Sequence, residues 1–414
     1  MKPRHLRPGD LPGVLSPGGL TLVSSSPAES GLLVAEVAAA GAALVDMTFS
    51  GIFVPGMNKA PWTAGPETSV LTFFQTPELK REGARSRFLP LCYQDVLRHY
   101  RSNPPAAALM MCSPPDEHGN CSFGAETAFI AALWPEIRMR IAHINPLMPR
   151  TPGDPGIPFS QLTAYFEGAQ PLRTMPVGTD AISEAIAALI APRIPNGATL
   201  QTGLGKIPDA VLRALGGHRN LSLHSGLIGD GALALVRSGA MAPGQSALAG
   251  VAIGSAELYA GLNDPHFQFR PVTVTHDPAT LSRIEKLVTI NSAMEVDLYG
   301  QVHAEASSRG FMSGPGGAGD YARGARASSG GLRIIALPSS AGATSRIVPA
   351  GSGHGPVSLS RFDVDLVVTE HGLADLRDLG HEQRAQALIS IAAPAHREDL
   401  ARGWRDSMNA LQEQ

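Results

Sequence analysis

The sequence is short of cysteine and has no long apolar run. Its three cysteines, Cys92, Cys112 and Cys121, are an odd number in no spacing typical of a metal site. We therefore expect reduced thiols and no bound metal. No apolar stretch reaches the ~18 residues that a membrane-spanning helix needs. The basic start MKPRHLRPGD has no apolar core behind it, unlike a secretion signal. These absences predict a cytoplasmic protein with no membrane partner.

Strong charge of either sign is also missing, and aromatic residues make up only 5% of the chain. A net charge of −3 gives no reason to expect nucleic acid as a partner. The 414 residues are 43% hydrophobic and 17% charged, as in a globular protein. This length predicts two or three domains' worth of sequence with an ample core. The 45 glycines and 34 prolines suit many tight turns between strands and helices.

Short apolar runs alternate with helical patterns along the chain. This alternation predicts the α/β class, with parallel sheets covered by helices. Turn-rich residues at 145–156 and a further break at 174–180 suggest an N-terminal α/β domain, 1–178, and a C-terminal α/β domain, 179–414. In the second domain we expect helices at 181–189 and 208–215 and strands at 199–202, 221–223, 287–291, 333–337 and 366–369.

A glycine turn opens the most informative segment, 203–231, which reads GLGKIPDAVLRALGGHRNLSLHSGLIGDG. The turn Gly203-Leu204-Gly205 follows an apolar run and leads into a predicted helix. Backbone N–H groups at a helix start attract anions, so a phosphate or an oxyanion could bind there. Alternatively, the glycines serve only the conformation of a tight turn. Pro208 replaces the last glycine of the dinucleotide-binding pattern, which disfavours a hydride-transfer enzyme.

A second glycine cluster occurs at 313–321, SGPGGAGDY, with four glycines between Gly314 and Gly319. Such a loop lets several backbone amides converge on one anion and lets a substrate pass close to the main chain. A flexible surface loop is the alternative interpretation.

Several ordered motifs resemble the acetyl-CoA hydrolase/CoA-transferase family, and in particular 4-hydroxybutyrate CoA-transferase-like proteins. The segment 203–231 is similar to the family's GIGxIPDAV…HTEMxxDG, and the second glycine cluster to its GxGGxxDF. Further similar stretches are CSPPDEHGNCSFG at 112–124, INSAMEVDLYGQV at 290–302 and VVTEHGLADLR at 367–377. The resemblance implies two open α/β domains of the CoA-transferase type facing across a cleft, with coenzyme A bound by the C-terminal domain.

The resemblance also assigns roles to residues. In the family, the Glu of the HTE motif attacks the acyl-CoA thioester and carries CoA as a glutamyl thioester, and Gly226 stands at that position here. The amides of Leu204 and Gly317 would polarise the thioester carbonyl. The residues expected to bind coenzyme A are Gly203, Leu204, Gly205, Lys206, Ile207, Gly314, Gly316, Gly317 and Gly319.

Three side chains are candidates for the remaining chemistry. His276 stands at what the resemblance indicates is an active-site Asn position, and a histidine that titrates near neutral pH can act as a general base. A loop histidine with no such role is the alternative. His224 is a second candidate base, although relatives carry His there too, which favours a structural role. Glu295 matches a carboxylate that relatives keep, and either orients other groups or replaces the nucleophile.

These residues predict an acyl-CoA-using enzyme that acts without a glutamyl-CoA intermediate and transfers the acyl group directly to water or to a bound acceptor. The space freed at Gly226 would admit that acceptor. A transferase is favoured over a hydrolase. The alternatives are a conventional CoA-transferase that uses Glu295 and a non-catalytic CoA-binding subunit. Coenzyme A would be a substrate and not a tightly bound cofactor, and the family resemblance leads us to expect a homo-oligomer.

Overall fold

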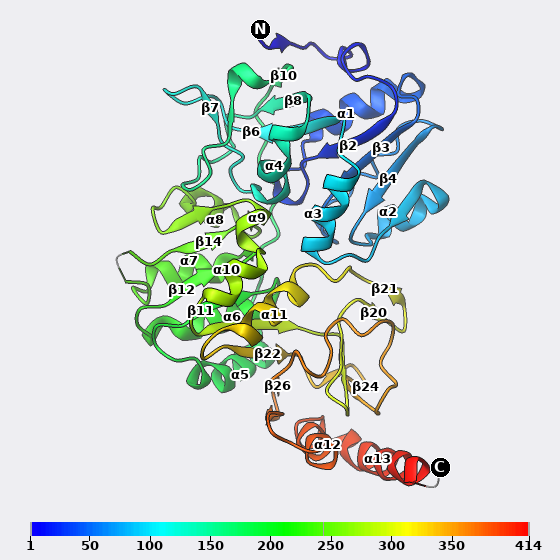
Figure 1. The fold of residues 1–414 in the computed structure, drawn as a ribbon, viewed down its shortest axis with the longest axis vertical. Coiled ribbons are helices and arrows are strands. Elements are labelled where there is room, and N and C mark those ends of the chain that lie inside the picture. Colours follow the sequence, from blue (N-terminus) through cyan, green and yellow to red (C-terminus); the bar gives the residue numbers. More distant parts are fainter. Residues whose placement is uncertain (1, 243, 413–414) are drawn as a thin grey trace. The chain divides into compact units, whose positions relative to one another are not determined.

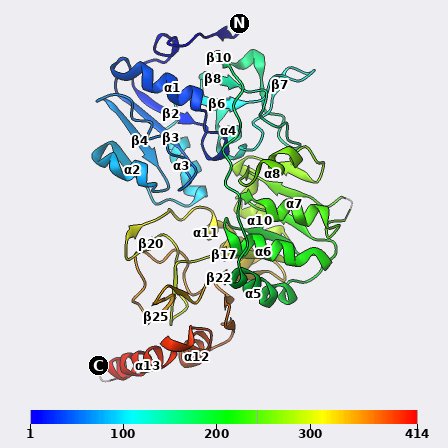
Figure 2. The ribbon, with the colours of Figure 1, turned by 180° about the vertical axis from the view of Figure 1, so that it is seen from behind.

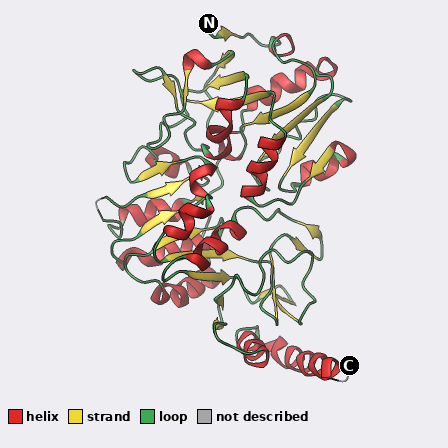
Figure 3. Ribbon diagram, in the orientation of Figure 1, coloured by secondary structure: helices red, strands yellow, loops and turns green. Residues whose placement is uncertain are grey.

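The computed structural model describes residues 2–242 and 244–412, which form two compact units. The first unit consists of 1–176, 225–227 and 246–277, and the second of 177–224, 228–245 and 278–414. Each unit is built of alternating strands and helices (Figures 1 and 3). The α/β class predicted from the sequence is therefore confirmed. Two segments of the predicted C-terminal domain, 225–227 and 246–277, belong to the first unit, and the boundary at 178 stays a prediction.

The first unit is organised around an eight-stranded parallel sheet with the strand order β1-β10-β8-β6-β2-β3-β4-β5. The chain runs from β2 outward to β5 and then returns to β6 beside β2, so the strand order reverses there. The strands are β1 (Arg4–His5), β2 (Gly19–Val23), β3 (Met47–Gly51), β4 (Thr68–Thr72), β5 (Ser86–Phe88), β6 (Ala107–Cys112), β8 (Met139–Ile144) and β10 (Ala164–Glu167).

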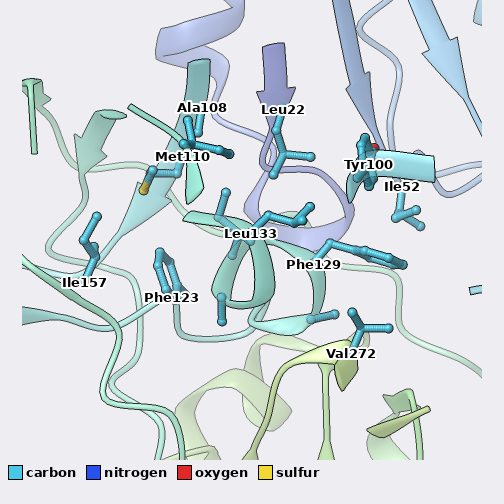
Figure 4. Close-up of a cluster of buried hydrophobic side chains, with 14 of the residues drawn as sticks. Leu22, Ile52, Tyr100, Ala108, Met110, Phe123, Phe129, Leu133, Ile157 and Val272 are labelled. Carbon is cyan, nitrogen blue, oxygen red and sulfur yellow. The ribbon is translucent and has the colours of Figure 1, made fainter. Parts of the chain in front are cut away.

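Helices close the faces of this sheet. They are α1 (Gly31–Ala40), α2 (Pro77–Arg81), α3 (Tyr93–Ser102) and α4 (Ala128–Leu133), and the unit also holds α8 (Ala256–Gly261) and α9 (Val272–Thr275). Figure 4 shows how α4 places Phe129 and Leu133 among side chains of β2 and β6, with Val272 of α9 at the edge of the same cluster. The remaining strands of the unit are β7 (Asn120–Cys121), β9 (Ile157–Pro158), β14 (Ala247–Ala249) and β16 (Phe267–Phe269).

The second unit carries a sheet with the order β12-β11-β17-β22-β26-β27, parallel except for its last pair. Helices α10 and α11 cover one face (Figure 1), and α5, α6 and α7 cover the other (Figure 2). The strands are β11 (Thr199–Thr202), β12 (Ser222–His224), β17 (Leu287–Ser292), β22 (Leu332–Ala336), β26 (Leu366–Thr369) and β27 (Gly372–Asp375). The helices are α5 (Ala181–Ile190), α6 (Lys206–Ala214), α7 (Asp230–Arg237), α10 (Pro278–Arg283) and α11 (Ala318–Ala327).

Short strands and two C-terminal helices complete this unit. A three-stranded sheet, β19-β18-β25, joins Val302–His303, Glu295–Asp297 and Ile347–Val348. Two hairpins, β20–β21 (Ala306–Ser307 and Gly310–Phe311) and β23–β24 (Ser340–Ala341 and Thr344–Ser345), lie between β19 and β25 in the chain. The chain ends in α12 (His381–Ser390) and α13 (Arg397–Gln412). No helix among the described residues is long and apolar enough to cross a membrane.

A buried carboxyl group lies near the end of β2 in the first unit. Both oxygens of Glu126 accept from the backbone N–H of Ser25, at 3.1 and 2.9 Å, and one also accepts from the Ser25 hydroxyl at 2.9 Å. Burial raises the pKa of Glu126 to about 8, against the opposing effect of the Ser25 hydrogen bonds. Glu126 is therefore mainly protonated in the folded protein at neutral pH.

This raised pKa predicts a pH-dependent loss of stability. The unfolded chain releases the Glu126 proton near pH 4.5 and the folded chain near pH 8, so stability falls as pH rises between these values. We expect Glu126→Gln to gain about 3–5 kcal/mol relative to the wild type between pH 5 and pH 8, measured by urea unfolding. Glu67→Gln, at an exposed position, is the control. A stability difference that stays constant with pH would contradict the assignment.

Candidate active site

The first glycine turn connects β11 to α6 in the second unit. Gly205 is the residue before α6 and has φ +127°, a backbone conformation that residues other than glycine rarely adopt. The helix starts at Lys206, two residues earlier than the sequence predicted, because the turn itself supplies the N-terminal cap. Gly203, Leu204 and Gly205 are half-buried. Their amides therefore lie next to the positive end of the helix dipole, where an anion is stabilised.

Two side-chain amides on the neighbouring strands β11 and β17 support this turn. Gln201 in β11 and Asn291 in β17 exchange two hydrogen bonds, at 3.1 and 3.0 Å, and both are buried. The N–H of Gly203 donates to the carbonyl of Ile290 at 3.1 Å. A Cβ on Gly203 would lie 3.3 Å from Asn291 Oδ1, so the backbone passes close to this pair. The turn is held at the carboxyl ends of two neighbouring parallel strands.

Lys206 and Ile207, two of the predicted coenzyme A contacts, differ in the exposure of their side chains. Lys206 is exposed, and its Nζ lies 3.0 Å from Asp180 Oδ2. Hydrogen bonds from Ser183 and Lys206 lower the pKa of Asp180 to about 2. A phosphate would have to compete with this carboxylate for the lysine. Ile207 is buried, so its side chain packs in the core and only its backbone is available.

The second glycine cluster leads into α11. Gly316 has φ +57°, and Gly317 is the residue before the helix, whose carbonyl accepts from the N–H of Tyr321 at 3.1 Å. Gly319 lies inside α11, so the loop is shorter than the sequence suggested. Its start is anchored at the carbonyl of Glu305, which accepts from Met312 N and Ser313 N at 2.7 and 3.2 Å.

The two glycine segments are at the same edge of one sheet. The Leu204 turn follows β11, and α11 connects back to β22, which pairs with β17 beside β11. A helix that precedes a parallel strand begins at the carboxyl edge of the sheet. His224, at the end of β12, is buried, and its ring lies 6.5 Å from the ring of Tyr321 in the first turn of α11. The second unit therefore brings His224 toward the start of that helix.

Gly226 and His276 are in direct contact in the first unit. A Cβ built on Gly226 would lie 2.4 Å from Cε1 and 2.7 Å from Nε2 of His276. No side chain larger than hydrogen fits at position 226 while the imidazole stays in place. Our expectation that the space freed at Gly226 would admit an acceptor is wrong, because His276 fills it.

Two residues contact the ring of His276, and a third holds its backbone. Its Nδ1 lies 2.8 Å from the hydroxyl of Thr275, and its ring centroid lies 4.8 Å from that of Tyr93. Its carbonyl accepts from Gln94 Nε2 at 2.6 Å. His276 is only 1% exposed, so the ring is part of a packed interior. Moving it away would require repacking around Tyr93.

Glu295, the first residue of β18, is held by a residue that the sequence motifs did not single out. Its Oε1 lies 2.8 Å from Nδ1 of His354, and its Oε2 accepts from the backbone N–H of the same residue at 2.8 Å. Both carboxylate oxygens are therefore engaged. The spacing between Glu295 and His354 matches no motif, and the only signal was a histidine between two glycines in SGHGP.

The contact between Gly226 and His276 predicts strong coupling between these positions. Gly226→Ala should destabilise the protein by about 1–3 kcal/mol, because the added methyl group overlaps the imidazole. In a His276→Ala background the same change should cost less than ~1 kcal/mol. Urea unfolding of the wild type, both single variants and the double variant gives the coupling energy. Additive effects would show that the ring does not occupy this space.

Several known proteins are similar to this chain in sequence or in structure. Residues 254–403 match the family model of the acetyl-CoA hydrolase/transferase C-terminal domain. The 4-hydroxybutyrate coenzyme A transferase of Clostridium kluyveri is 37% identical over 329 residues, 76% of each chain. RipA from Yersinia pestis has a similar structure, with a TM-score of 0.91 at 27% identity over 98% of each chain.

A 4-hydroxybutyrate CoA-transferase from Porphyromonas gingivalis also has a similar structure, with a TM-score of 0.81 at 30% identity over 98% of each chain. The predicted CoA-transferase type of α/β fold is confirmed by these structures. The identity to the clostridial transferase covers three quarters of both proteins, which is too extensive for a shared fold alone. The chain belongs to the acetyl-CoA hydrolase/CoA-transferase family.

Proposed function

We propose that this protein is an acyl-CoA-using enzyme that transfers the acyl group directly to water or to a bound acceptor, without a glutamyl-CoA intermediate. The observation that carries the proposal is the contact at Gly226, where the imidazole of His276 fills the volume of the first side-chain carbon. A covalent route needs a nucleophile. At this position the chain has none and has no space for one.

Coenzyme A would bind along the two glycine segments of the C-terminal domain. The N–H of Gly203 is hydrogen-bonded to the carbonyl of Ile290, so the first turn offers the amides of Leu204 and Gly205 at the start of α6. The loop at Gly316 and Gly317 offers amides at the start of α11. In our proposal the amides of Leu204 and Gly317 stabilise the oxyanion that forms on the thioester carbonyl. Backbone donors of this kind typically contribute ~10²-fold or more to the rate. They do not depend on the residue at position 226.

Transfer is favoured over hydrolysis because several similar curated proteins are CoA-transferases, among them the succinyl-CoA:acetate/propanoyl-CoA:succinate CoA transferase of Fasciola hepatica, which is 37% identical. An acetyl-CoA hydrolase of Eremothecium gossypii is 30% identical over 50% or less of either protein. The sequence predicts His276 and His224 as candidate bases for the attacking group, and both side chains are buried. We also propose that the protein is cytoplasmic and, from the family resemblance, that it is a homo-oligomer.

Two alternatives use the same fold. A conventional CoA-transferase would need another carboxylate as nucleophile, and Glu295 is the candidate. Its two oxygens are both engaged by His354, which supports an orienting role instead. A non-catalytic CoA-binding subunit would bind CoA without turnover.

Single-turnover assays with a panel of acyl-CoAs, each in water alone and with added acceptors, test the proposal. We expect CoA release with at least one acyl-CoA and no glutamyl alcohol after borohydride reduction, as analysed by mass spectrometry. A reduced Glu295 would instead identify a conventional transferase. CoA binding by calorimetry with no release under any condition would identify a non-catalytic subunit.

The steric conflict at position 226 predicts how a covalent route can be restored. Gly226→Glu alone should yield no trapped adduct, because the new side chain and the imidazole compete for one volume. Gly226→Glu combined with His276→Ala removes the conflict and should give a borohydride-reducible thioester with acyl-CoA.

Gly226→Gln with His276→Ala is the matched control, with the same size and no nucleophile. Equal trapping in the single and double glutamate variants would mean that the imidazole moves aside freely. Trapping in neither would mean that position 226 does not face the thioester.

A further inference from the structure

A hydrogen-bonded carboxylate–histidine pair in the second unit has no role in the function proposed so far. Glu295 is 7% exposed, whereas the side chain of His354 is 47% exposed. The carboxylate meets Nδ1 of the imidazole at 2.8 and 3.1 Å and also accepts the backbone N–H of His354. A buried anion thus holds one side of an imidazole whose other side extends toward solvent.

The loop that carries His354 lies flat against neighbouring strands. A Cβ on Gly353 would lie 2.2 Å from the ring of His303, and one on Gly355 would lie 2.6 Å from Cβ of Ala306. Only glycine permits this close approach on both sides of His354. Gly351, two residues before Gly353, donates its N–H to Asp297 Oδ2 at 3.0 Å. The histidine is therefore presented by a loop whose backbone is fixed, although the loop is on the surface.

The Glu295–His354 geometry suits proton transfer. A carboxylate that accepts from Nδ1–H fixes the tautomer and the ring orientation, and leaves Nε2 as the proton-accepting nitrogen. Nε2 of His354 points away from Glu295, and no hydrogen bond to it is found in the described part of the chain.

Two other histidine–carboxylate pairs lack either the buried carboxylate or the short hydrogen bond. In the pair of His266 and Asp264, at 2.8 Å, the carboxylate side chain is 41% exposed. His371 and Glu370 are 3.7 Å apart, beyond hydrogen-bond distance.

The pair is connected to the second glycine cluster through the residues that follow β19. The hydroxyl of Ser358 accepts from Ala304 N at 3.0 Å and donates to Glu305 Oε1 at 2.8 Å, which joins the end of the His354 loop to this stretch. The carbonyl of Glu305 in turn anchors Met312 and Ser313, where the glycine cluster starts. Ser358 and Glu305 thus link the chain that follows the His354 loop to the start of the glycine cluster.

We propose that His354, oriented by Glu295, is the catalytic base for an acceptor that carries a hydroxyl group, either water or an alcohol. This proposal rests on the direct acyl transfer proposed above. The acceptor oxygen bonds to the thioester carbonyl carbon while Nε2 takes its proton, which gives a tetrahedral oxyanion. The C–S bond then breaks, and the proton passes from Nε2 to the sulfur, so the products are the acyl ester or acid and CoA thiol.

The need for a base distinguishes between acceptor classes. A carboxylate acceptor has no proton on its attacking oxygen at neutral pH, so a base would contribute nothing to its attack. A hydroxyl compound does need one. The presence of an oriented imidazole thus favours hydroxyl acceptors over the carboxylates named for the similar CoA-transferases.

The test compares variants in the single-turnover assay of CoA release, with the most reactive acyl-CoA of the panel. We expect His354→Gln to lower the rate by about 10²–10⁴-fold at saturating acyl-CoA, with little change in the half-saturating concentration. His354→Ala should regain part of the rate when imidazole is added. His266→Gln, which removes the exposed histidine–carboxylate pair, is the matched control and should leave the rate unchanged.

Glu295→Gln provides a second variant, and we expect a loss of about 10–100-fold because the imidazole is oriented less strictly. Asp297 and His303, on the neighbouring strands, and Glu305, between β19 and β20, lie around the pair and stay unchanged in both variants. The pH profile of the rate should lose its acid limb in His354→Gln only.

The outcomes separate the two proposals. A wild type that releases no CoA overturns direct acyl transfer and the role of His354 with it. An active wild type with a His354→Gln rate within about threefold overturns only the role of His354. A large loss with no imidazole rescue and an unchanged pH profile would assign His354 to loop structure and also overturn the proposal.

Discussion

The candidate site depends on one steric constraint, which is that a side chain at position 226 and the imidazole of His276 cannot occupy the same volume. The ring is packed against Tyr93, bonded to Thr275 and almost fully buried, so it is not a loose side chain that moves aside at little cost. Glycine at 226 and histidine at 276 are therefore a matched pair. A chain that acquired only one of these residues would carry either a cavity or a clash.

The backbone donors proposed to bind the thioester do not depend on the side chain at 226. The turn at Gly205 and the loop at Gly317 present backbone amides, and their positions are set by β11, β17 and α11. The amide pair of Gln201 and Asn291 fixes the first of them between two strands. Because these donors belong to the main chain, a substitution at a distant side chain does not remove them.

Much of the fold could be predicted from the sequence, because short apolar runs that end in turns indicate parallel strands. The strand predicted at 366–369 has the observed bounds of β26, and the helix predicted at 181–189 differs from α5 by one residue. Errors occurred where glycine conformation decides the boundary. Gly205 caps α6 earlier than expected, and Gly319 is helical although it belongs to a glycine-rich run.

The site was less predictable, because its main contacts join residues that are far apart in the chain. Motif matching identified Gly226, His276 and Glu295 individually, yet it gave no indication that the first two touch. Nor could it pair Glu295 with His354, 59 residues later, because that pairing depends on two glycines letting a loop lie against β19. Local patterns report on local structure, whereas contacts of this kind depend on how several loops pack.

His276 and His354 have different surroundings and therefore different roles in the proposed site. His276 is enclosed by aromatic and backbone groups, so its imidazole contributes volume and shape, and any proton exchange would have to take place in a packed interior. His354 has one nitrogen fixed by a buried carboxylate and the rest of its ring near solvent, which leaves it free to exchange a proton with a substrate. If acyl transfer is direct and the acceptor carries a hydroxyl group, the attacking oxygen must lose its proton to a side chain of the second kind, because a tetrahedral intermediate forms readily only from a deprotonated attacker. A site that lost covalent catalysis would then depend more on its base than on its nucleophile.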